Sequence, residues 1–93
     1  MTISLQLSLD GAEKENVKAV LLRQSGKEVG RWGENGSDLD SSIDVDAVVT
    51  QVTVFYANGS KDNGSIDPDS DGYVIIEANG SGNTQIDYSL PVD

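Results

Sequence analysis

The sequence predicts an all-β fold, a small antiparallel β-sandwich or barrel of about six strands with an immunoglobulin-like or jelly-roll-like arrangement. Three observations predict it. Segments near both ends alternate polar and apolar residues, the middle is rich in β-branched residues, and glycine-containing turn dipeptides separate these segments. Because the chain has 93 residues, we expect one domain covering residues 1–93.

The two alternating segments predict strands near the two ends of the sequence. Residues 2–9 alternate strictly, which is typical of a half-buried strand. The residues expected to face inward are Ile3, Leu5, Leu7 and Leu9. In residues 86–92 the same pattern predicts an inward face formed by Ile86, Tyr88, Leu90 and Val92. Pro91 has no N–H to donate, which favours an edge position for this segment.

Two apolar segments predict central strands. Residues 47–57 and 72–78 are rich in valine, isoleucine and aromatic side chains, which favour pleated sheets. Residues 17–24 are compatible with either a strand or a helix, because Asp10 and Glu13 match a capping box and the following apolar residues have helical spacing. We expect a strand, since residues 24–28 look like a hairpin turn that leads into another strand at residues 29–32.

The turns are predicted by Asn-Gly, Asp-Gly and Ser-Gly dipeptides. The Asn-Gly pairs begin at residues 35, 58, 63 and 79. Each pair can supply the positive φ that tight hairpins need. The tetrapeptide Ala-Asn-Gly-Ser occurs twice, starting at Ala57 and Ala78, and each copy follows an apolar strand. We interpret the two copies as similar hairpin turns.

The chain is strongly acidic, and the acidity is uneven along the sequence. It has 16 Asp and Glu against 6 Lys and Arg, a net charge of −10. Residues 1–37 are neutral overall, and residues 38–93 carry the whole net charge with Lys61 as their one cation. Such a chain is not expected to bind nucleic acid or an anionic membrane. It could dock on a cationic protein, or head to tail on the basic part of another copy.

Composition also excludes much catalytic chemistry. The chain has no His and no Cys, which removes imidazole triads, thiolate nucleophiles, zinc sites of the Cys/His type and disulfides. We therefore do not expect an enzyme. The longest apolar runs are far shorter than the roughly 20 residues that span a bilayer, and no signal peptide is recognisable at the start. We expect a soluble cytoplasmic or virion-associated protein.

The sharpest motif is an acidic loop at residues 67–72. Asp67, Asp69 and Asp71 occupy positions 1, 3 and 5, with glycine at position 6, which can aim three oxygens at one calcium ion. The motif resembles the first half of an EF-hand loop. The Tyr73 carbonyl would be a fourth ligand, and Glu77 is one candidate for completing the shell. The other candidates are Asp62, Asp38, Asp40, Asp44 and Asp46.

The loop departs from an EF-hand after its sixth position. Ala78 stands at position 12, where a bidentate Glu belongs, and the flanking residues predict a strand. A calcium loop within a β-framework remains the metal hypothesis, with a simple hairpin turn as the alternative. The second acidic set, around Asp44 and Asp46, predicts an exposed strand face with Ile43, Val45 and Ala47 on its other side, and the alternative is a second metal or partner site.

These observations give three functional hypotheses. The first is a non-catalytic structural or interaction module that assembles with copies of itself or decorates a larger particle such as a virion or surface appendage, with calcium at residues 67–72. The alternative is a small acidic inhibitor, of the phage anti-defence or immunity type, that masks a basic nucleic-acid-binding surface. A third is a calcium-dependent sugar-binding protein.

Overall fold

The protein is described by a computed structural model that covers residues 1–91, and these residues form eight strands and one short 3-10 helix. The strands are β1 (Thr2–Asp10), β2 (Val17–Gln24), β3 (Lys27–Gly33), β4 (Ser42–Asp46), β5 (Thr50–Tyr56), β6 (Lys61–Ile66), β7 (Gly72–Ala78) and β8 (Thr84–Ser89). The 3-10 helix η1 (Lys14–Asn16) directly precedes β2. No helix within the described residues has the length and apolar character needed to span a membrane.

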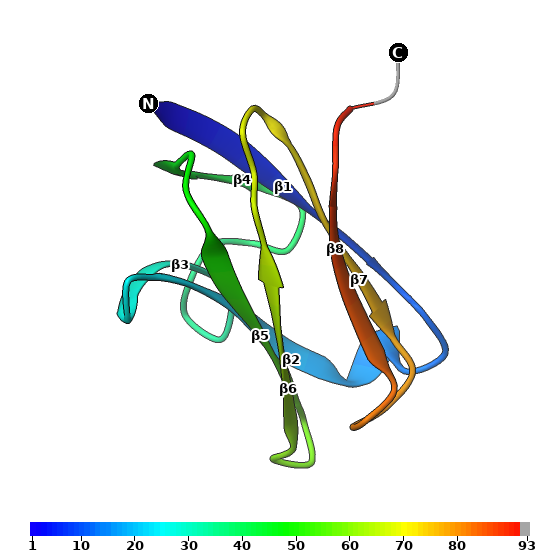
Figure 1. Cartoon of the computed structure of the whole chain (residues 1–93). Helices are drawn as coiled ribbons and strands as arrows, with labels where there is room; N and C mark the ends of the chain where they lie inside the picture. Colours follow the sequence, from blue (N-terminus) through cyan, green and yellow to red (C-terminus); the bar gives the residue numbers. More distant parts are fainter. Residues whose placement is uncertain (92–93) are drawn as a thin grey trace.

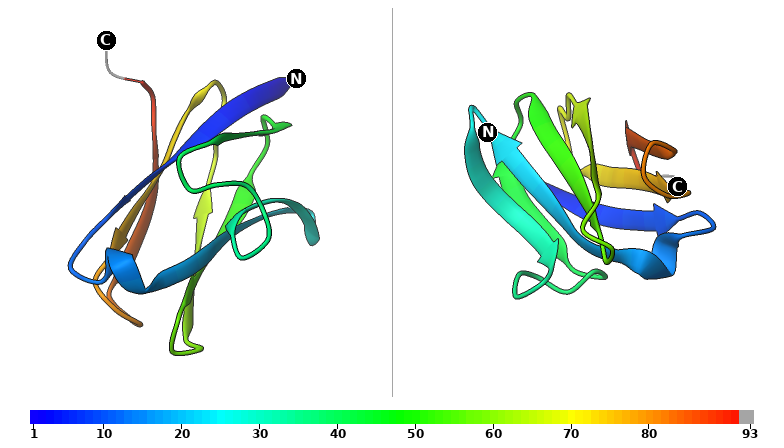
Figure 2. Two further views of the ribbon diagram at one scale, coloured as in Figure 1. Left: turned by 180° about the vertical axis from the view of Figure 1, so that it is seen from behind. Right: turned by 90° about the horizontal axis from the view of Figure 1, so that it is seen from below.

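The strands form two four-stranded sheets that pack face to face (Figures 1 and 2). Sheet A has the order β4-β1-β7-β8, and sheet B has the order β3-β2-β5-β6. The neighbouring strands are antiparallel except β1 and β7, which run parallel. The predicted all-β sandwich is confirmed, with eight strands in place of six and with one parallel pair among antiparallel ones.

The core lies between the sheets and follows from strand alternation. On each strand, every second side chain points into the space between the sheets, and the side chains between them point outward. Sheet A contributes Ile3 and Leu5 from β1, and sheet B contributes Val52 and Val54 from β5. Trp32 of β3 is fully buried and donates from its indole nitrogen to the Ser41 carbonyl at 2.9 Å.

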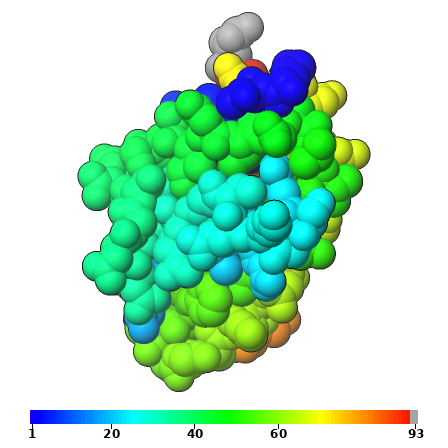
Figure 3. Space-filling view, turned by 90° about the vertical axis from the view of Figure 1, so that its left-hand side faces the viewer, coloured from blue at the N-terminus to red at the C-terminus, as the bar shows by residue number. Residues whose placement is uncertain are grey.

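At each lateral edge of the sandwich, a glycine on the edge strand of one sheet faces a large side chain on the edge strand of the other sheet. On one side, a Cβ at Gly64 of β6 would lie 2.8 Å from Ile86 of β8. On the other, a Cβ at Gly30 of β3 would lie 2.6 Å from Ile43 of β4. Figure 3 shows this second side, where the cyan β2–β3 hairpin lies against the green residues of β4 and the following connection. The glycines therefore let the edges of the two sheets approach closely.

Most predicted strands are confirmed. Residues 17–24 form β2 rather than a helix, and Ser25 and Gly26 make the predicted turn with φ of 52° and 79°. Residues 72–78 form β7, which is central in sheet A, and β8 is an edge strand as expected. Asp44 and Asp46 are exposed on β4, while Ile43 and Val45 are buried.

Three local predictions are wrong. Residues 47–49 are not part of β5, because the chain crosses there from sheet A to sheet B, and Val48 and Val49 are left exposed. Leu90 is 55% exposed because β8 ends at Ser89, and Val92 lies outside the described residues. The Asn-Gly pair at residues 63–64 lies within β6 rather than in a turn, since Gly64 serves the close contact with Ile86.

Candidate functional site

The outer face of sheet A is acidic. Its strands contain no Lys or Arg, and all of their acidic residues are exposed. Each of these carboxylates points outward, because the adjacent residues of the same strand point toward the core. The acidic residues are Asp10 on β1, Asp44 and Asp46 on β4, Glu77 on β7 and Asp87 on β8. We call this surface the acidic face.

The centre of the acidic face is less polar. Tyr73 and Ile75 of β7 point outward and are half-buried. Tyr73 lies opposite Gln6 of β1, and Ile75 lies opposite Asp87 of β8. The carboxylates therefore surround an aromatic and an aliphatic side chain, an arrangement in which an apolar centre has a charged rim.

The outer face of sheet B carries the opposite charge. Register places Arg31 of β3 opposite Leu21 of β2, and Lys61 of β6 opposite Phe55 of β5. Arg23 of β2 lies one row further along the same face. We call this surface the cationic face, and its outward charged residues are Arg23, Arg31, Lys61 and Glu28.

Only part of the positive charge on sheet B is neutralised. Glu28 accepts a hydrogen bond from Arg31 at 2.9 Å, and Glu34 pairs with Lys18 at 2.8 Å. Within residues 1–91, Arg23 and Lys61 have no carboxylate oxygen within 4.0 Å. The Arg23 guanidinium donates only to the carbonyl of Gly26, at 3.3 Å. Both cations are therefore free to meet a carboxylate from another molecule.

The fold sorts charge by sheet rather than by position along the chain. The strands of sheet A hold five acidic residues and no basic ones, and those of sheet B hold five basic residues and two acidic ones. The chain crosses repeatedly between the sheets, and most strand charges lie on the matching side, with Glu28 and Asp62 on sheet B as the exceptions. Comparison with protein-family models, curated proteins and solved structures gives no match. The surface chemistry nevertheless defines two complementary faces on opposite sides of one small body.

The predicted metal loop is surface structure between β6 and β7. Asp67, Asp69 and Asp71 are exposed, and Pro68 between the first two is buried. Asp71 accepts a hydrogen bond from the Ser4 backbone N–H at 2.8 Å, so this carboxylate ties the loop to β1. Tyr73 lies near the start of β7, and Glu77 lies near its far end.

The structure does not bring the proposed calcium ligands together. Among residues 1–91, no group of three or more carboxylate side chains is close enough to hold one metal ion. Glu77 lies four residues beyond Tyr73 on an extended strand, a span of about 13 Å, which removes it from the loop. The other candidate carboxylates also do not gather around residues 67–72. The calcium site stays a prediction that this arrangement does not support.

Calcium titration by calorimetry tests the metal prediction. If the loop binds calcium, uptake is saturable, and it falls at least tenfold in Asp69→Ala, whose carboxylate contacts only Ser70. A calcium concentration about 100 times Kd would then stabilise the fold by about 2.7 kcal/mol. Glu15→Ala is the control, since it removes an exposed carboxylate that is outside the loop and is not a candidate ligand. Absence of saturable heat at millimolar calcium would remove the loop as a metal site.

Proposed function

We propose that this protein is a non-catalytic interaction module that self-associates by stacking its acidic face on the cationic face of another copy. The observation that carries the proposal is the segregation of charge between the two sheets. Facing surfaces of opposite sign attract at short range and fix the orientation of the partners. The chain also offers no His or Cys for the common nucleophilic and acid–base arrangements.

The position of the faces determines the kind of assembly. The molecule measures 36 × 31 × 22 Å, and the two charged faces lie on opposite sides of the sandwich. Contact between two different surfaces is heterologous, and it continues without closing when the surfaces point in opposite directions. Stacking therefore supports an open row of subunits, which suits a surface appendage or the coat of a larger particle such as a virion.

A specific contact would use a modest share of the molecular surface. A standard interface buries about 800 Å² on each partner. The described chain exposes 5367 Å², so such a contact would use roughly one seventh of its surface. Tyr73 and Ile75 on one side, and the half-buried Phe55 on the other, would supply apolar contact inside the charged rim.

Salt should affect this association in two directions. At about 10 mM salt the Debye length of about 30 Å approaches the size of the molecule, so copies repel through their net charge of −10. At about 0.15 M, only charges within about 8 Å interact strongly, and the complementary faces dominate. At about 1 M the contact itself is screened. We expect sedimentation velocity to show the largest species at the intermediate salt concentration.

The outcome of the salt series separates this proposal from simple colloidal behaviour. Association that rises continuously up to 1 M salt would indicate apolar contact rather than charge complementarity. A monomer at all three salt concentrations, at protein concentrations near 1 mM, would contradict self-association. Millimolar calcium or a chelator should leave the result unchanged, because the two faces exclude residues 67–72.

The acidic inhibitor is a second candidate, and the absence of Lys and Arg from the strands of sheet A favours it. Such a protein would use the same acidic face against a basic groove on its target. The two functions differ in their need for the cationic face. Replacing Arg23 and Lys61 with Gln should abolish self-association and leave binding to a basic target intact.

A further inference from the structure

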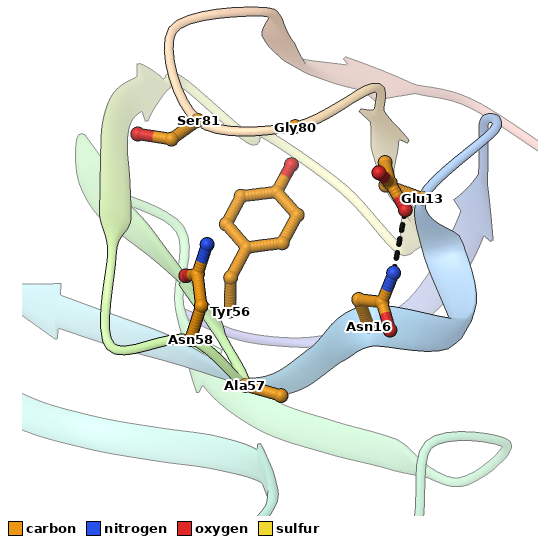
Figure 4. Close-up of a pocket in the computed structure, with 7 residues that line it drawn as sticks. All are labelled: Glu13, Asn16, Tyr56, Ala57, Asn58, Gly80 and Ser81. Carbon is orange, nitrogen blue, oxygen red and sulfur yellow. Dashed lines mark hydrogen bonds between the residues drawn. The ribbon is translucent and has the colours of Figure 1, made fainter.

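A pocket lies at the end of the sandwich where η1 and two hairpins meet (Figure 4). Its volume is about 390 Å³, within the range of small-molecule sites. Glu13 and Asn16 come from η1 and its approach, Asn58 from the β5–β6 turn, and Ser81 from the β7–β8 turn. Tyr56, which is only 3% exposed, lies between these walls.

The fold brings the two Ala-Asn-Gly-Ser segments to this pocket. Ala57 and Asn58 of the first copy, and Gly80 and Ser81 of the second, line it. The Asn58 side-chain oxygen accepts hydrogen bonds from the N–H and hydroxyl of Ser60, at 3.0 and 2.6 Å. This leaves the Asn58 amide nitrogen as a donor, and Figure 4 shows it on the side nearer Ser81.

The opposite wall presents acceptors. Asn16 donates from its amide nitrogen to one carboxylate oxygen of Glu13 at 2.5 Å. The second Glu13 oxygen and the Asn16 side-chain oxygen make no hydrogen bond among the described residues, and neither does the Ser81 hydroxyl on the Asn58 side. Figure 4 shows Asn58 and Ser81 on one side of Tyr56 and Glu13 and Asn16 on the other, so the Asn58 donor and the Glu13 carboxylate lie on opposite sides of the pocket.

A hydrogen-bond network holds these walls in place. The Tyr56 hydroxyl pairs with the Thr84 hydroxyl, and Thr84 donates to Asp62 at 2.6 Å. Asp62 also accepts from the backbone N–H of Gly82, which fixes the β7–β8 turn against β6. The backbone N–H of Ala57 donates to the Asn16 carbonyl at 2.8 Å and joins the other two elements. The pocket is therefore preorganised, which reduces the entropy cost of binding.

We propose that this pocket binds a neutral polyhydroxyl ligand, such as one hexose unit of a glycan. Each hydroxyl group both donates and accepts, so neighbouring hydroxyls can donate to Glu13 and Asn16 while another accepts from Asn58. The Glu13 carboxylate disfavours an anion. A simple cation has no acceptor for the Asn58 amide group. A ligand that has both hydrogen-bond donors and acceptors is therefore favoured. None of the residues that line the pocket is a charged residue of either face, so ligand binding is expected without self-association.

Titration monitored by amide NMR spectra tests the proposal, with glucose, galactose and N-acetylglucosamine as probes and methylammonium as the cationic comparison. We expect at least one sugar to shift the amides of Asn16, Asn58 and Ser81 saturably, with a Kd of about 1–10 mM. Asn16→Ala should weaken that binding at least tenfold. The control is Asn83→Ala, an exposed Asn at the same end that does not line the pocket.

A charge-removing variant separates the two ligand classes. Glu13→Gln keeps an acceptor for Asn16 and should weaken sugar binding only about two- to fivefold, whereas binding of a cation should be lost. The proposal is overturned if no sugar shifts these amides at about 50 mM, well above the Kd expected for so small a site. It is also overturned if methylammonium alone binds, or if Asn16→Ala and Asn83→Ala have equal effects.

Discussion

Replacement of Trp32 by alanine is expected to destabilise the fold by about 3–5 kcal/mol. Trp32 is fully buried between the sheets, and its indole N–H donates to the Ser41 carbonyl at 2.9 Å. Alanine would leave a cavity of several carbon atoms and an unpaired carbonyl. A domain of this size has a total stability of about 5–14 kcal/mol, so the loss is a large fraction of it. Urea unfolding followed by far-ultraviolet circular dichroism measures the effect.

Two further variants make the Trp32 result specific. Leu39→Ala removes a 40% exposed side chain from the connection that follows β3, and we expect a change of about 0.5 kcal/mol or less. Trp32→Phe keeps most of the ring and removes the N–H, with an expected cost of about 1–3 kcal/mol from the Ser41 carbonyl. A free energy of unfolding for Trp32→Ala equal to that of Leu39→Ala would contradict the packing described for Trp32.

Gly11→Ala is the second substitution with a large expected effect. Gly11 has φ of 109°, and a Cβ there would lie 2.3 Å from the Ala78 carbonyl oxygen. The backbone N–H of Glu13 donates to that same oxygen at 2.8 Å, so the clash would separate the β1–η1 connection from the end of β7. We expect a destabilisation of at least about 3 kcal/mol from backbone strain and overpacking together.

Gly59→Ala is the matched control for Gly11→Ala. Gly59 has a similar φ of 91°, and a Cβ there would have no atom within 4 Å. Its replacement should therefore cost only the conformational strain, about 1–2 kcal/mol. Thermal unfolding of both variants compares them under the same conditions. If the two variants lose equal stability, the close approach of Gly11 to Ala78 is not a determinant of the fold.

Local sequence patterns predicted the apolar strands because burial imposes a period of two on their side chains. Residues 2–9 show this alternation directly, whereas residues 72–78 were predicted from their β-branched and aromatic side chains and residues 17–24 from the hairpin turn that follows them. All three form strands near the predicted bounds. β6 could not be found in this way. Its sequence is polar except for Ile66, and its Asn-Gly pair is typical of a turn. Pairing with β5 and the contact of Gly64 with Ile86 determine its conformation, and both are tertiary interactions.

The charged faces were only partly predictable. The sequence shows cations concentrated in residues 14–31, but it assigns Lys61 to the acidic half of the chain. Because β6 pairs with β5, Lys61 lies on the face that carries Arg23 and Arg31. Likewise, Asp10 and Glu77 are far apart in sequence and lie opposite each other only because β1 pairs with β7. Surface patches of this kind depend on strand order, which periodicity does not encode.

The calcium loop remains a prediction, and its spacing is also compatible with a purely structural role. Carboxylates at alternate positions before a glycine satisfy the spacing of a metal loop. In the structure, Pro68 is buried and Asp71 binds the Ser4 backbone, so the loop serves to connect β6 with β7 and to anchor that connection on β1. Spacing alone could not distinguish these two roles, because both favour Asp, Pro and Gly.

Exchange of charge between the two faces tests the central claim most directly. One variant carries Asp44→Lys, Asp46→Lys and Glu77→Lys, which reverse the sign of the acidic face, and the other carries Arg23→Glu and Lys61→Glu on the cationic face. Each variant has two faces of like charge, so we expect each to be monomeric at about 0.15 M salt. An equimolar mixture restores opposite charges at every contact. Sedimentation velocity should then show association in the mixture, and a mixture that stays monomeric, or either variant that associates alone like the wild type, would contradict the account.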